Sequence, residues 1–171
     1  MHVHNVHERS LARPAAQVGA LIDTLASDHD RLWPLPLWPE MHFDRPLGVG
    51  AIGGHGPIGY DVEAYEPGSR VRFRFTQPVG FKGYHEFLVI PSGDDAAILR
   101  HTLEMETSGS GLLAWQLAVR HFHDASLEDA LAYAEAALGL PVHVVPWGWY
   151  VRYLRRAGMP NLPTKHVIPG A

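Results

Sequence analysis

The stretch Arg70-Val71-Arg72-Phe73-Arg74-Phe75 decides the fold class of this chain. Its apolar side chains fall on every second residue and its arginines on the residues between, which is the period of a strand with one buried and one solvated face. A helix would distribute the same side chains around its axis. An antiparallel sheet that covers a core on one side is therefore expected.

Further strands flank this segment on both sides. Residues 60–64 alternate before it, and residues 81–90 and 97–107 alternate after it, with a turn at Pro91-Ser92-Gly93-Asp94-Asp95 between the last two. These two segments are predicted to form a hairpin. The segment 2–9 also alternates and is expected to be an edge strand.

Two segments have the period of a helix instead. Apolar residues recur at spacings of three and four from Pro14 to about Ala26, and again from Leu112 to Leu138, where the helix would have about seven turns. The glycine-rich stretch 48–59 is expected to form a tight turn or a strand bend. The class is thus α+β: a curved antiparallel sheet of about six or seven strands, wrapped around a long C-terminal helix, with short helices after the first strand.

Composition limits the possible functions. The chain has 171 residues, the size of one domain, and a formal net charge of -4, which argues against nucleic acid as a partner. It has no cysteine, which agrees with a reducing compartment, so a cytoplasmic location is expected. Residues 1–10 have neither the basic start nor the apolar segment of a signal peptide, and no stretch is long and apolar enough for a membrane span.

The order of elements and several residue strings resemble the START-like superfamily, also called SRPBCC. The strings are Gly54-His55-Gly56-Pro57-Ile58-Gly59-Tyr60 with residues 62–68 and 71–75, then residues 99–104, and His123-Asp124-Ala125 with residues 128–131. This superfamily includes birch-pollen-allergen-type, polyketide cyclase/dehydrase and lipid-transport proteins. The resemblance covers residues 1–139 and implies a helix-grip fold with a cavity between sheet and helix. Residues 140–171 would be a C-terminal extension, packed on the domain or in a dimer interface.

The inward faces of these elements are candidates for the wall of such a cavity. An apolar ligand is expected to contact side chains from the sheet and from the inner stripe of the long helix, unless they simply fill a core. The candidate ligand-binding residues are Tyr60, Val71, Phe73, Phe75, His85, Phe87, Leu99, His101, Leu103, Val119, His123 and Ser126.

Three of these candidates are histidines that would converge in the interior. His85 and His101 lie on the inward faces of the two hairpin strands, as cross-strand neighbours if the loop has an odd number of residues, and His123 lies on the inner stripe of the helix. They would orient a ligand by hydrogen bonds, act as catalytic acid and base, or hold a metal; the alternative is a structural role. No metal or cofactor is predicted, because no histidine pair has a ligand spacing on one helix.

The carboxylates do not suggest a catalytic pair. Glu104 and Glu106 fall opposite the apolar face of their strand, and Asp124 and Glu128 fall on the outer face of the helix. A solvated or salt-bridged role is expected for all four. The arginines at 70, 72 and 74 are expected to pair with Glu104 and Glu106 on the outer surface of the sheet.

Three functions remain open at this level. The first is binding or carrying of an apolar small molecule, which would be lipid-, polyketide- or aromatic-like. The second is a cyclase/dehydratase-type enzyme that uses a cavity histidine as acid or base. The third is a protein interaction module built on the aromatic segment 147–156. That segment and the tryptophan-rich loop 33–39 would each form a lid over the cavity, a homodimer interface or, as a weaker option, a point of attachment to a membrane surface.

Overall fold

The computed structural model describes residues 1–170, and a seven-stranded antiparallel sheet lies at its centre. The order across the sheet is β1-β7-β6-β5-β4-β3-β2, so β1 is an edge strand as predicted. The prediction of a curved sheet of six or seven strands is confirmed. The strands are β1 (His2–Leu11), β2 (Met41–Phe43), β3 (Ile52–His55), β4 (Ile58–Glu66), β5 (Arg70–Gln77), β6 (Phe81–Pro91) and β7 (Ala97–Thr107).

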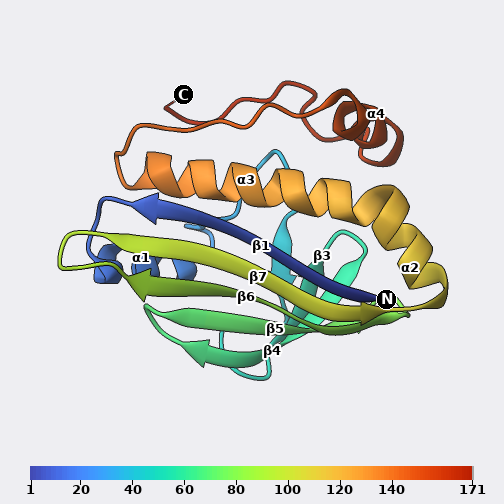
Figure 1. Cartoon of the computed structure of the whole chain (residues 1–171), viewed down its shortest axis with the longest axis horizontal. Coiled ribbons are helices and arrows are strands. Elements are labelled where there is room, and N and C mark those ends of the chain that lie inside the picture. Colours follow the sequence, from blue (N-terminus) through green and yellow to red (C-terminus); the bar gives the residue numbers. More distant parts are fainter. Residues whose placement is uncertain (171) are drawn as a thin grey trace.

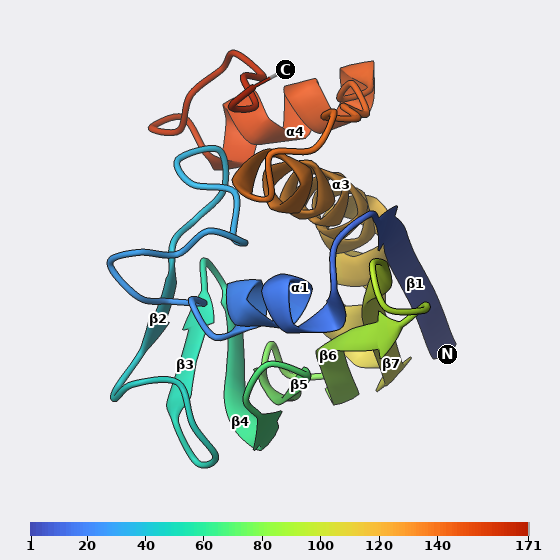
Figure 2. The same cartoon turned by 90° about the vertical axis from the view of Figure 1, so that its left-hand side faces the viewer.

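A long helix lies across the concave face of this sheet (Figure 1). It comprises α2 (Gly109–Ala114), a π-helical turn η1 (Trp115–Val119) and α3 (Arg120–Ala137), and it follows β7 directly. The short helix α1 (Ala15–Ile22) lies at one end of the sheet, and α4 (Trp149–Gly158) lies on the far side of α3 (Figure 2). This is the predicted helix-grip architecture. Within residues 1–170, no helix is long and apolar enough to cross a bilayer.

Two short strands were not foreseen in the sequence. The glycine-rich stretch forms β3 and the turn into β4, and β3 pairs with β2 on its other side. A Cβ atom at Gly53 would lie 1.8 Å from the carbonyl oxygen of His42 on β2. Glycine is therefore needed here for the close approach of two backbones, and it removes the alternating apolar pattern that identifies the other strands.

The long helix is not a regular α-helix throughout. A continuous helix was expected from Leu112, whereas the structure starts the helix at Gly109 and inserts the π-helical turn at Trp115–Val119. Turns of this kind change the direction of the side chains that follow and occur often at functional sites. Here the turn adjoins the cavity described below.

The prediction for the outer arginines was wrong. Arg72 donates to Glu86 at 2.8 Å, Arg74 pairs with Glu63, and Arg70 pairs with Glu66 at 2.8 Å. Strand β6 lies between β5 and β7, so the expected partners on β7 are two strands away, at about 10 Å. Those carboxylates serve the edge strand instead: Glu104 lies 3.4 Å from both His2 and His4, and Glu106 lies 3.6 Å from the N-terminal ammonium group.

The C-terminal extension packs on α3 through one buried carboxylate. Asp129 is 1% exposed and accepts hydrogen bonds from Trp38 Nε1 at 2.8 Å, Trp147 Nε1 at 2.9 Å and His166 Nε2 at 2.6 Å. The guanidinium of Arg155 on α4 lies over both indole rings, at 4.5 Å and 4.1 Å from their centres. Loop 33–39 and the extension are thereby held on the same stretch of α3.

Replacement of this carboxylate is expected to loosen both segments. Asp129→Leu leaves two buried indole N–H groups without an acceptor, and we expect it to lower the free energy of unfolding by about 3 kcal/mol or more. Asp129→Asn retains an amide oxygen for both indoles and is expected to cost less than half as much. Urea unfolding measures both; equal losses for the two variants would contradict this role of the acceptor.

Candidate functional site

A cavity of about 320 Å³ lies between the concave face of the sheet and the long helix. Its wall is mainly aromatic and aliphatic, with imidazoles as most of its polar groups. Every layer of the molecule contributes to it, from the sheet to α4. The principal lining residues are Trp33, Pro39, Met41, His55, Ile58, Phe75, Phe81, His85, Phe87, His101, Leu103, Trp115, Ala118, Val119, Phe122, His123, Ser126, Leu127 and Met159.

Most of the residues proposed from the sequence lie on this wall. They are Phe75, His85, Phe87, His101, Leu103, Val119, His123 and Ser126. The other four do not line it. Tyr60, Val71, Phe73 and Leu99 are fully buried in the main core.

Packing against other side chains accounts for these four residues. Helix α1 packs against β5, β6 and β7 at one end of the concave face. Tyr60, on β4, packs instead against Phe73 and His85. Phe73 in addition stacks on Phe43, with ring centres 5.9 Å apart. The repeat of two residues predicts which face is inward, but the position of the empty volume along the strands depends on where α1 packs.

Both tryptophan-bearing segments reach the edge of the cavity. Trp33 and Pro39 line it from the loop, and Gly158 and Met159 line it from the end of α4. This is the arrangement that a lid would have. His55 on β3 and Trp115 on η1 also line the cavity and were not among the candidates. Only weak signals in the sequence mark these two residues: His55 lies between two glycines, and Trp115 lies near the start of the helical stripe.

The two strand histidines are in contact, although they are not directly opposite each other. The β6–β7 register places His85 opposite Leu103 and His101 opposite Phe87, so the two histidines are cross-strand neighbours, as expected, in a diagonal pair. The two histidines stay on one face and meet diagonally. His85 Nδ1 lies 3.2 Å from His101 Nε2, which makes a buried imidazole–imidazole hydrogen bond.

The remaining nitrogen atoms of these rings have no hydrogen-bond partner. They are His85 Nε2 and His101 Nδ1, and both nitrogens of His123 are also buried without one. The ring of His123 lies 5.1 Å from that of His101, centre to centre. Buried polar atoms are seldom left unpaired, and such groups beside an apolar cavity are available to a ligand.

Burial keeps these imidazoles neutral. Desolvation, reinforced by neighbouring imidazoles, holds the pKa of His85 and that of His101 well below the usual value, and the pKa of His55 falls to about 4. Burial also lowers the pKa of His123, and Asp124 only partly opposes this. A neutral imidazole can both donate and accept a hydrogen bond, so each ring can respond to either kind of ligand group.

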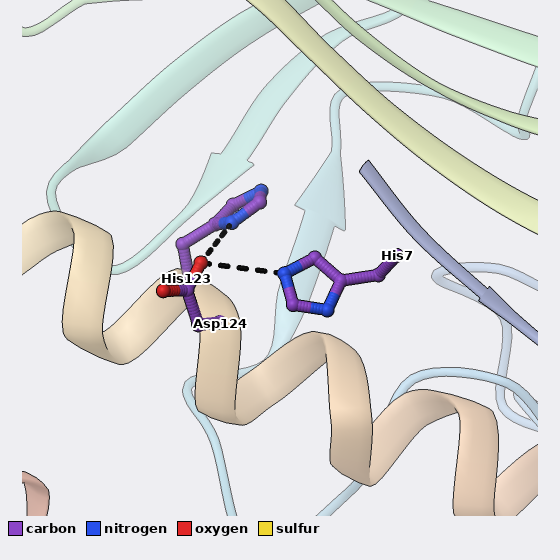
Figure 3. A group of neighbouring side chains, drawn as sticks. All are labelled: His7, His123 and Asp124. Atoms are coloured by element: carbon purple, nitrogen blue, oxygen red, sulfur yellow. Dashed lines mark hydrogen bonds and ion pairs between the residues drawn. The ribbon is translucent and has the colours of Figure 1, made fainter. Parts of the chain in front are cut away.

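A cluster of polar side chains, which includes His7 and Asp124, adjoins His123 on the side of β1 (Figure 3). Asp124 Oδ1 lies 3.3 Å from His7 Nε2 and 3.6 Å from His123 Nδ1, and Glu128 Oε1 lies 2.7 Å from His7 Nδ1. Burial opposes a charge on His7, but the two carboxylates outweigh it and raise its pKa to about 9. Asp124 and Glu128 are therefore salt-bridged, as expected, and they connect α3 to β1.

The outer side of α4 carries exposed aromatic residues. Trp149 is 73% exposed and Tyr153 is 62% exposed, and Leu113 and Leu117 of the neighbouring helix are also exposed. Tyr150 donates a hydrogen bond to the carbonyl of Leu117 and so joins the two helices. This surface is separate from the cavity and is the kind of face that an interaction module would use.

The curved antiparallel sheet closed by a long C-terminal helix is a fold that this chain shares with a solved START superfamily protein. Comparison of sequences adds nothing, since no family model and no curated protein matches the chain.

Solved structures with this fold cover most of the chain. Norcoclaurine synthase from Thalictrum flavum is 15% identical, with a TM-score of 0.62 over 81% of this chain and 96% of that one. A protein from Thermobifida fusca is 18% identical, with a TM-score of 0.62 over 83% and 97%. A START superfamily protein from Mycobacterium smegmatis is 15% identical, with a TM-score of 0.53 over 77% and 94%. At these identities the likeness concerns the fold.

Because His85 and His101 are neutral in the folded chain, we expect the free energy of unfolding to decrease at acid pH. The folded chain cannot readily protonate His85 or His101, whereas the unfolded chain protonates them below a pH of about 6.5, so stability falls as the pH falls. Each can contribute up to about 2 kcal/mol of loss between about pH 7 and about pH 5. His7 acts in the opposite direction: its pKa is raised to about 9 in the folded chain, which therefore holds the proton already at pH 7, whereas the unfolded chain takes it up mainly between about pH 7 and about pH 5. His7 therefore offsets up to about 1 kcal/mol of the loss.

Urea unfolding at the two pH values measures this loss. The variant His101→Leu removes one titrating group and is expected to lose about 2 kcal/mol less on acidification than the parent chain. The variant His4→Gln, on the exposed face of β1, provides the control and should lose as much as the parent. An unchanged loss in His101→Leu would contradict a neutral, buried His101.

Proposed function

We propose that this protein binds a small apolar or aromatic molecule in the cavity between the sheet and α3. The observation that carries the proposal is an apolar cavity with unpartnered imidazole nitrogens at its wall. Ligand sites are typically cavities of this kind, mostly apolar with a few polar groups that fix orientation. A reducing, cytoplasmic setting accords with the absence of cysteine.

The dimensions of the cavity favour a compact ligand. Its volume of about 320 Å³ is near the lower end of the range for small-molecule sites. A ring system with one or two oxygen atoms would place its carbon skeleton against Phe75, Phe87 and Leu103 and an oxygen at the histidines. Among the three apolar classes considered, an aromatic or folded polyketide-like molecule therefore fits better than a long lipid chain.

Native mass spectrometry of the purified chain tests the proposal directly. We expect an apolar molecule to co-purify at one copy per chain and to leave on denaturation. The probe 2-naphthol, two fused rings with one hydroxyl group, provides a second test. Because Trp33 and Trp115 line the cavity, binding of 2-naphthol should quench their fluorescence.

A larger side chain within the cavity should exclude the probe. Ala118 lines the cavity from η1, and we expect Ala118→Phe to weaken 2-naphthol binding by at least about tenfold, since the ring occupies the space of the ligand. Ala114→Phe, on α2 and outside the wall, is the matched control and should bind as the parent does. Equal affinity in all three proteins would contradict a site in this cavity.

A second candidate function is an acid/base enzyme of the cyclase or dehydratase type. The hydrogen bond between His85 and His101 favours it, because a neutral imidazole can take a proton from a substrate while its partner stabilises the resulting charge. The catalytic candidates remain His85, His101 and His123.

The co-purified molecule makes this candidate testable. If the chain is an enzyme, incubation of that molecule, or of its hydrated precursor, with the parent protein should change its mass by one water or rearrange it. His101→Gln is expected to retain binding and to lower turnover by about 100-fold or more. Turnover that survives in His85→Gln, His101→Gln and His123→Gln alike would exclude this function.

A further inference from the structure

The polar cluster between β1 and α3 has the arrangement of a metal site. Figure 3 shows the side chains of His7, His123 and Asp124 directed toward one another from two elements far apart in the sequence. One donor atom from each lies within 4.8 Å of the others. The geometry points to a binding site for a divalent transition-metal ion of the zinc type, held by His7 Nε2, His123 Nδ1 and Asp124 Oδ1.

The distances already approach those of a bound ion. Ligand atoms about 2.1 Å from a tetrahedral zinc ion lie about 3.4 Å from one another. Asp124 Oδ1 is 3.3 Å from His7 Nε2 and 3.6 Å from His123 Nδ1. An ion can therefore be accommodated with shifts of a few tenths of an ångström along these two edges.

The surroundings of His7 fit a metal ligand. A histidine that binds a metal through one nitrogen usually donates its other N–H to a carboxylate, which fixes the ring. Glu128 Oε1 accepts from His7 Nδ1 at 2.7 Å, and Arg9 holds the other oxygen of Glu128 at 3.0 Å. This arrangement directs His7 Nε2 toward Asp124, where the ion would replace the proton that now joins them.

Two further observations support the site independently. Both nitrogens of His123 lack a hydrogen-bond partner, so its Nδ1 is available. Asn5 Nδ2 donates to Asp124 Oδ1 at 3.0 Å, while Asn5 Oδ1 is buried without a partner. Rotation of this amide by half a turn would present that oxygen to the ion as a fourth ligand and satisfy it.

The local charge also suits a divalent cation. Glu128 and Glu135 pair with the single guanidinium of Arg9, and Asp124 adds a third carboxylate beside His7. With His7 neutral, two negative charges remain for the ion to balance. Asp124 is 40% exposed and Glu128 is 24% exposed, which leaves a path from solvent.

Titration of the whole chain with Zn²⁺ alone tests the site. Isothermal titration calorimetry should show one ion per chain with a Kd of about 10 µM or tighter. His123→Gln and Asp124→Asn should each weaken binding by at least about tenfold. Co²⁺, which has visible absorption bands when tetrahedral, should compete with Zn²⁺ and show those bands in the parent chain but not, at the same concentration, in His123→Gln or Asp124→Asn.

Two more variants separate this site from surface histidines and from misfolding. His4→Gln, exposed on the same strand and paired with Glu104, should bind as the parent does. Glu128 is not one of the three proposed ligands and contacts one of them, His7, so Glu128→Gln should weaken binding about tenfold while one ion per chain is retained. Far-ultraviolet circular dichroism verifies that each variant is folded.

Several outcomes would overturn the inference. They are a Kd weaker than about 1 mM, equal weakening by His4→Gln and His123→Gln, or full binding in folded Asp124→Asn. In each case the cluster is an ion-pair network that only joins α3 to β1. Binding of 2-naphthol does not depend on this result, because Phe75, Phe87 and Ala118 lie outside the cluster.

Discussion

A single buried carboxylate determines which parts of this chain meet. Asp129 accepts hydrogen bonds from two indoles and an imidazole that come from a proline-rich loop and from the C-terminal extension. Neither segment, up to residue 170, pairs with the sheet, so side-chain contacts such as these hold both in place. Because an unpaired carboxylate is costly to bury, this arrangement is stable only when all three donors are present. Both segments also line the cavity, so the hydrogen bonds of Asp129 on α3 help to set the boundary of the cavity.

The cavity depends on that boundary. The inward residues of the sheet near α1 fill their space completely, whereas further along the strands the wall is completed by Trp33, Pro39 and Met159. An apolar enclosure also explains the chemistry of the imidazoles, since desolvation keeps His85 and His101 neutral. The same apolar enclosure therefore bounds the cavity and keeps these two imidazoles neutral.

His123 lies at the junction of two environments. One side faces the apolar cavity, and the other faces Asp124, whose carboxylate also serves His7. On the cavity side desolvation favours neutral rings, and on the β1 side the carboxylates hold a positive charge. A few ångströms thus separate a site suited to an uncharged ligand from one suited to a cation. The helix supplies both because the ring of His123 lines the cavity while its Nδ1 lies 3.6 Å from Asp124 Oδ1.

The sequence by itself determined the fold class, the hairpin, the long helix and which residues face inward. These depend on local periods of 2 and 3.6 residues, which are visible along a single chain. Tertiary structure alone decided the rest: the diagonal contact of His85 with His101, the place of the empty volume beyond α1, and the meeting of His7 with Asp124. Each of these depends on register or on packing between distant segments, and neither leaves a repeating signal in the sequence.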